Sequence, residues 1–122
     1  MFASKLLSRA TPLAARRFIQ TEAEMAKKGI TLPEYQDAVW SYVKGQWDGD
    51  NLHIGDHVGQ RLNTETGAME TVRGKVGTRP RATITSEEAE ELCVHAALIL
   101  LSTVNNYTKK SLDKVVQVIK IT

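Results

Sequence analysis

The sequence predicts an α+β domain, and three observations lead to that class. Short segments rich in β-branched and aromatic residues, separated by glycine-containing turns, occupy residues 38–76. A helical pattern with a capping signal begins at Thr85, and a second β-branched stretch follows at 111–122. Strands followed by a helix and a further strand, without regular βαβα alternation, are typical of the α+β class.

Three strands are predicted in the first of these regions. Residues 38–46 (AVWSYVKGQ) and 51–58 (NLHIGDHV) have strand-like composition and are separated by the turn WDGD. The run RLNTETGAM that follows is typical of a hairpin loop. Residues 69–76 (METVRGKV) then return as the third strand.

The clearest predicted helix starts with a capping box at Thr85 and Glu88, in which the hydroxyl and the carboxylate each bind the other residue's backbone amide. Apolar and small residues recur at helical spacing after it and form one packing face: Ala89, Leu92, Cys93, Ala96, Ile99, Leu100 and Thr103. The helix is expected to end near Asn105-Asn106.

The stretch 111–122 (SLDKVVQVIKIT) is predicted as a last strand because it is dense in Val and Ile. The helix between it and the third strand has about the length that a right-handed parallel crossover requires. This predicts a mixed sheet with the helix packed on one face.

The first eighteen residues predict a mitochondrial transit peptide. They are rich in basic, small and apolar residues and contain no acid, and Arg16-Arg17-Phe18 resembles a processing site. This places the protein in the mitochondrial matrix; a disordered basic tail is the alternative. Residues 19–37 follow as a short helix and a linker, with Thr21 as N-cap, Glu24 as its capping partner, and Gly29 ending the helix.

Composition excludes several classes of protein. No apolar run approaches the roughly 18 residues of a membrane span. Cys93 is the single cysteine, so no internal disulfide framework forms, and its apolar neighbours indicate a small buried thiol. The chain has 16 basic and 14 acidic residues. Four of the basic ones lie in residues 1–18, so the remainder is net acidic, which argues against a nucleic-acid partner.

His53 and His57 are the residues that first suggest a metal site. An i, i+4 histidine pair holds zinc on a helix, but Gly55 and Gly59 favour a strand running into a turn. On a strand the two side chains would share a face about 13 Å apart, too far for one ion with bonds near 2 Å. We therefore expect no metal here.

The other candidate motifs have structural explanations. GKVG at 74–77 lacks the glycine spacing of a phosphate-binding loop and is better explained as a turn. EEAEE at 87–91 is the acidic start of a helix, favoured by the helix dipole. No G-x-S-x-G elbow is present.

Several stretches, taken in order over residues 25–122, resemble the reactive-intermediate deaminase family, also called the YjgF or L-PSP family. The matching pieces are MAKKGITLPE, Tyr42-Val43 followed by Gly49-Asp50-Asn51-Leu52, Gly74-Lys75-Val76-Gly77, Glu87-Glu88-Ala89 with Cys93, and SLDKVVQVIKI. The resemblance identifies residues 38–122 as a partial YjgF-like domain. Such proteins continue with a second helix and further strands, so the sequence is expected to match an incomplete, truncated form.

The resemblance implies a chorismate-mutase-like fold, a homotrimer, and hydrolysis of small reactive enamines and imines such as 2-aminoacrylate. No metal or organic cofactor is implied, because water attacks the imine carbon directly.

The site residues follow from aligning this family's Ser-Gly-Gln signature. Without gaps from Tyr42, the signature falls on Gly55, Asp56 and His57; a shifted alignment places its Gly-Gln on Gly59-Gln60. In the first alignment, Tyr42, Gly55 and Asp56 are expected to contact the substrate, and His57 to orient the water. The alternative is a non-catalytic structural or interaction subunit of a mitochondrial assembly, because the signature Ser is missing.

Overall fold

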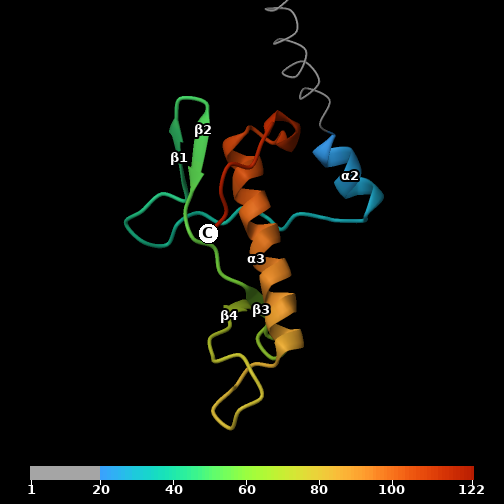
Figure 1. Ribbon diagram of the computed structural model, residues 1–122, viewed down its shortest axis with the longest axis vertical. Coiled ribbons are helices and arrows are strands. Elements are labelled where there is room, and N and C mark those ends of the chain that lie inside the picture. Colours follow the sequence, from blue (N-terminus) through green and yellow to red (C-terminus); the bar gives the residue numbers. More distant parts are fainter. Residues whose placement is uncertain (1–19) are drawn as a thin grey trace, which may run out of the picture. The chain divides into compact units, whose positions relative to one another are not determined.

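The computed structural model describes residues 20–122 (Figure 1). The chain divides into two compact units. Within the described residues, one unit comprises residues 20–31 and 105–122, and the other comprises Leu32–Val104. The transit peptide predicted at 1–18 lies outside the described residues and stays a prediction.

Two β-hairpins form the strands of the unit Leu32–Val104 (Figure 1). β1 (Gly45–Asp48) pairs antiparallel with β2 (Asn51–Ile54), and Gly49 has a φ of +57° in the tight turn between them. That angle is the one a two-residue hairpin turn needs at its first central position. β3 (Gln60–Leu62) pairs antiparallel with β4 (Met69–Thr71), as the predicted hairpin loop requires.

The strand predicted at 38–46 is displaced to Gly45–Asp48, and the strand predicted at 51–58 is shortened to Asn51–Ile54. Residues 38–44 contain no strand, and the pairing that begins at the turn ends where the Gly55 amide donates to the Lys44 carbonyl at 2.9 Å. Beyond that bond the chain leaves the hairpin, and His57 and the Gln60 amide bind Thr103 and His95 of α3 instead.

The strand predicted at 69–76 is also shorter than expected. β4 ends at Thr71, and the next pairing is a single parallel bridge between Val76 and Ile84. The reason is that β3 supplies only three residues to pair with.

The long helix α3 (Ser86–Tyr107) is confirmed, including its capping box. The Glu88 amide donates to Thr85 Oγ1 at 3.2 Å, and the Thr85 amide donates to Glu88 Oε2 at 2.8 Å. Its inner face carries the buried Ile99, as the spacing predicts.

The prediction of a buried thiol is wrong, because Cys93 is exposed. It follows Leu92 by about 100° of helix rotation, so it lies beside the packing face and not on it.

The other unit contains α2 (Thr21–Lys27) and a 3-10 turn, η1 (Leu112–Lys114). Gly29 ends α2 with a φ of +66°, as predicted. The predicted cap at Thr21 is wrong: Thr21 is the first helical residue, and the Glu24 amide donates to the Gln20 carbonyl. Glu22 instead binds η1, since its amide donates to Asp113 and its carboxylate accepts from the Leu112 amide.

The strand predicted at 111–122 does not form. Residues 112–114 make η1, and residues 115–122 belong to no strand or helix. A β-branched sequence becomes a strand only where a neighbouring strand accepts its backbone hydrogen bonds. Within the described residues no strand pairs with this segment.

The α+β class is therefore confirmed, with two separate antiparallel sheets of two strands each in place of one mixed sheet. Among residues 20–122 the buried hydrophobic residues are few: Ile84 and Ile99 in one unit and Leu112 in the other.

Candidate functional site

The predicted site residue His57 lies against the inner face of α3. Its Nδ1 is 2.8 Å from the Gly55 carbonyl oxygen, and its Nε2 is 2.8 Å from Thr103 Oγ1. Because a carbonyl only accepts, Nδ1 must carry the proton. The neutral ring then leaves Nε2 as the acceptor of the Thr103 hydroxyl proton.

The Thr103 hydroxyl has a second possible acceptor, which competes with His57 for its proton. Its oxygen also lies 3.2 Å from the Ile99 carbonyl, and the residue is only 1% exposed. A hydroxyl has one proton to donate. When the hydroxyl proton points to the Ile99 carbonyl, Nε2 of His57 no longer accepts it.

His95 provides the reciprocal contact from the helix. Its Nδ1 lies 3.2 Å from the Gln60 backbone nitrogen and accepts that amide's proton, so Nε2 carries the proton of the neutral ring. The two histidines therefore bind the segment 55–60 to α3 from both sides, and we refer to His57, Thr103, His95 and Gln60 as the histidine clasp.

Gly59 sits between the two histidine contacts, and it explains why the segment approaches the helix so closely. A Cβ built on Gly59 would contact the Leu92 carbonyl oxygen and lie 2.9 Å from the Leu92 carbonyl carbon and Cβ. No other residue type fits without movement of the backbone. This site therefore requires glycine for space and not for a positive φ.

The structure brings together only part of the predicted site. Gly55 and His57 share a hydrogen bond, whereas Tyr42 and Asp56 are exposed, and their side chains form no hydrogen bond with either residue. In the shifted alignment, Gly59 and Gln60 both lie against α3, and Gln60 Oε1 is buried without a hydrogen-bond partner.

Sequence reasoning missed two members of the histidine clasp. The sequence predicts Thr103 only as a packing residue, and His95 is not among the predicted site residues. The signal for His95 was present: it follows Leu92 by three residues and precedes Ile99 by four, which places it on the packing face. Nothing in the sequence joins Thr103 to His57, which lies 46 residues away.

The histidines do not form a metal centre with their neighbours. His53 lies on β2 opposite Gln46, while His57 is bound to Gly55 and Thr103. Within residues 20–122, no group of three His, Cys, Asp or Glu side chains is placed to hold an ion.

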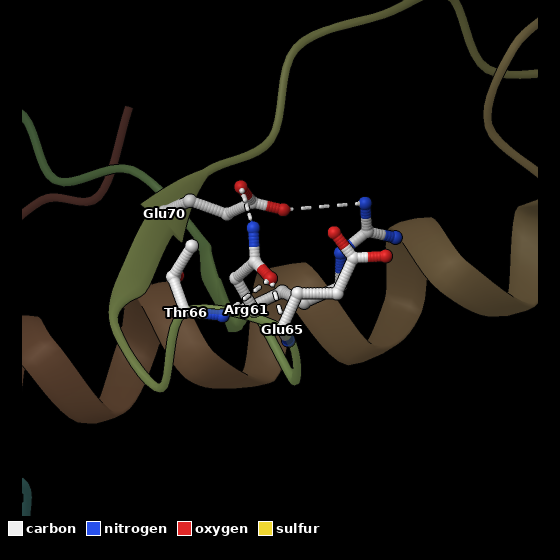
Figure 2. Close-up of polar contacts among 5 residues, drawn as sticks. Arg61, Glu65, Thr66 and Glu70 are labelled. Carbon is white, nitrogen blue, oxygen red and sulfur yellow. Dashed lines mark hydrogen bonds and ion pairs between the residues drawn. The ribbon is translucent and has the colours of Figure 1, made fainter.

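A second polar cluster stabilises the β3–β4 hairpin (Figure 2). Asn63 accepts the Glu65 and Thr66 amides on its Oδ1 and donates through Nδ2 to Glu70 Oε2 at 3.1 Å. The other Glu70 oxygen is 3.6 Å from an Arg61 guanidinium nitrogen. These residues are mostly exposed, and the Asn63 contacts explain how the loop turns.

Among the carboxyl groups at 20–122, Glu88 is the one whose pKa clearly departs from the ordinary value. The Thr85 backbone amide lowers its pKa, and the Thr85 hydroxyl and the Arg61 charge act in the same direction, partly opposed by desolvation. The cause is helix capping, so this shift marks a stable helix start and not a catalytic acid.

Comparison of the chain with protein-family models, with curated proteins and with solved structures gives no match. Among the helices at 20–122, none has the length and apolar character needed to cross a bilayer.

Proposed function

We propose that this chain is an interaction subunit of a mitochondrial assembly. The observation that carries the proposal is the exposure of its large apolar side chains. Val39 is 86% exposed and Trp40 is 79% exposed, and Tyr42 and Val43 next to them are also exposed. Contiguous exposed apolar residues of this size are typical of surfaces that a partner covers.

The segment 115–122 supports the same proposal. The backbone is extended at Val115, and most of the residues that follow are exposed, with Ile121 at 83%. Exposed Val and Ile side chains on a backbone that pairs with no described strand are suited to strand addition at the sheet edge of another protein. We therefore assign this segment to strand addition onto a partner.

Localisation in the mitochondrial matrix belongs to this proposal. It rests on the basic, acid-free character of residues 1–18, which an import pathway recognises.

The test is to isolate the full chain from mitochondria under mild conditions. We expect other proteins to be recovered with it in a fixed ratio. The variant Val39→Ser/Trp40→Ser should lose them, because two exposed apolar side chains at the interface are removed. The control Thr64→Ala/Glu65→Ala changes two exposed polar positions and should retain the other proteins. Recovery of the chain free of any other protein would contradict the proposal.

Imine and enamine hydrolysis of the YjgF type is the second candidate function. It is favoured by the order of the sequence motifs and by the orientation of His57, whose Nδ1–H bond to Gly55 fixes the ring. If the Thr103 hydroxyl turns to the Ile99 carbonyl, Nε2 becomes free to accept a proton from water. The water oxygen then bonds to the imine carbon, and the proton taken by Nε2 passes to the imine nitrogen. The C–N bond breaks as the hydroxyl proton moves to nitrogen, so that ammonia leaves and the carbonyl forms.

This candidate is tested with 2-aminoacrylate generated in place by a dehydratase. An active chain should release ammonia faster than buffer does, and His57→Ala should abolish the excess. His53→Ala is the control and should leave the rate unchanged. A rate equal to that of buffer would remove this candidate without affecting the interaction proposal.

A further inference from the structure

The loop between β4 and α3 carries a concentration of positive charge. Four basic residues within nine positions are all exposed, and none forms an ion pair with a described residue: Arg73, Lys75, Arg79 and Arg81. In their midst Val76 is 57% exposed. We call residues 73–81 the basic loop.

Backbone contacts hold the basic loop in a defined shape. The Thr83 and Ile84 amides donate to the Lys75 carbonyl at 2.9 and 3.1 Å, and the Gly77 amide donates to the Ile84 carbonyl at 3.1 Å. Gly74 packs so closely that a Cβ there would contact Thr83 Oγ1 and lie 2.9 Å from atoms of the Ile84 side chain. The cations are therefore presented from an ordered backbone, which lowers the entropic cost of binding.

The outer face of α3 has the opposite charge in a similar arrangement. Glu87, Glu90, Glu91 and Val94 line a shallow, open depression. Their spacing of three, one and three residues places them on one face of the helix, away from the histidine clasp. Val94 is 57% exposed among these carboxylates. We call these four residues the acidic face.

We propose that the basic loop of one copy of this chain docks on the acidic face of a second copy. Each surface has an exposed valine among charges of a single sign, and the two signs are opposite. An apolar centre with a complementary charged rim is the usual composition of a specific interface. The proposal goes beyond the interaction function above, because it names a contact between copies of this chain.

The same observations explain why the partner is another copy and not a nucleic acid. Arg81 is followed within ten residues by Glu87, Glu88, Glu90 and Glu91, so a phosphate backbone approaching the loop would meet carboxylates nearby. A second copy brings carboxylates to the loop and cations to the acidic face. Because the contact joins two different surfaces, it is heterologous and leads to a closed ring or a longer array.

The first test is sedimentation of the purified full chain at varied salt. We expect association at about 0.01 M salt, where the screening length is about 30 Å, and its loss at about 1 M, where that length is about 3 Å. A chain that stays monomeric at low salt, or an oligomer indifferent to salt, would overturn the proposal.

Charge reversal then identifies the two surfaces. Arg79→Glu/Arg81→Glu and Glu90→Lys/Glu91→Lys should each be monomeric, and both should keep the circular dichroism of the parent. An equimolar mixture of the two variants should associate again, because each supplies the charge that the other needs. The four changes combined in one chain should also restore association.

Other results would contradict this assignment. Failure of the mixture to associate would overturn it, as would association retained by either variant alone. Binding of a DNA oligonucleotide by the monomer, lost in Arg79→Glu/Arg81→Glu, would assign the basic loop to a nucleic acid instead. Copurification of other proteins in the mitochondrial experiment does not depend on any of these outcomes.

Discussion

Gly59 and His57 show how two neighbouring residues set the distance between a loop and a helix. Gly59 lets the backbone touch Leu92, and His57 reaches past it to Thr103. His95 closes the contact from the helix by accepting the Gln60 amide proton. Gly59, His57 and His95 together therefore hold residues 55–60 on α3.

Replacement of Gly59 by alanine should destabilise the protein. The added Cβ overlaps the Leu92 backbone, and overpacking of this kind costs about 1–3 kcal/mol. Urea denaturation measures the change in the free energy of unfolding. Gly55→Ala is the matched control: its Cβ would lie 3.7 Å from the Lys44 carbonyl oxygen, an ordinary contact, so the change should stay below about 1 kcal/mol.

The bond between His57 and Thr103 is tested by a double-mutant cycle. His57→Ala and Thr103→Val should each lower the free energy of unfolding by about 1 kcal/mol, the usual net value of one such hydrogen bond. Because both changes remove the same bond, the double variant should lose less than the sum. His53→Ala should have little effect, since His53 is exposed on β2. Strict additivity would show that the bond contributes nothing.

At the scale of elements, the sequence correctly predicted the start of α3 and a hairpin turn, whose residues are close together in the chain. The capping box of α3 joins Thr85 and Glu88, three residues apart, and it forms as predicted. The hairpin turn at Gly49 is equally local. The strand predicted at 111–122 failed because its partner would have to come from a distant part of the chain.

Thr85→Ala should destabilise α3 by about 1 kcal/mol, a usual cost of losing an N-cap side chain. The hydroxyl that accepts the Glu88 amide proton is removed, while Glu88 keeps its bond to the Thr85 amide. Thermal unfolding followed by circular dichroism measures the effect. Thr78→Ala in the basic loop is the control. Thr83→Ala is unsuitable because the Thr83 hydroxyl accepts a hydrogen bond from the Lys75 amide.

The Glu88 carboxylate should make stability depend on pH. Its pKa is lower in the folded protein than in the unfolded chain, because the Thr85 amide and hydroxyl and the Arg61 charge favour the ionised form. The stabilisation is therefore complete above the unfolded-state value, near pH 4.3, and is lost as pH falls through the lower folded-state value. Relative to Glu88→Gln, the wild type should be more stable at neutral pH. The two should converge in acid; a difference independent of pH would contradict this cause.

At the scale of the whole molecule, the balance between buried and exposed apolar side chains is unusual. Ile84, Ile99 and Leu112 are the buried hydrophobic residues among those described, while Trp40, Trp47 and several valines are exposed. Hydrophobic burial is the main favourable term in folding. The proposed partners, if they bind only the folded state, would add to the free energy of unfolding.

Tryptophan fluorescence should report this assembly. In the dilute full chain, emission should be that of a solvent-exposed indole, because Trp40 is largely exposed. Binding to partners should shift the emission to shorter wavelength as the ring leaves water. Trp47→Phe isolates the signal of Trp40 and should retain the shift, whereas Trp40→Phe should reduce it. An unchanged spectrum in the assembled protein would contradict burial of Trp40.

The sequence by itself determined the α+β class, the start of α3, the two hairpin loops and the end of α2 at Gly29, because each depends on residues a few positions apart. Tertiary structure alone decided that residues 55–60 lie on α3, that Thr103 and His95 hold them there, and that residues 115–122 pair with no strand in the described part of the chain. The physical reason is that capping and turns are local backbone chemistry. Which surfaces pack together depends on contacts between residues far apart in the chain, and hydrophobic periodicity does not predict such contacts.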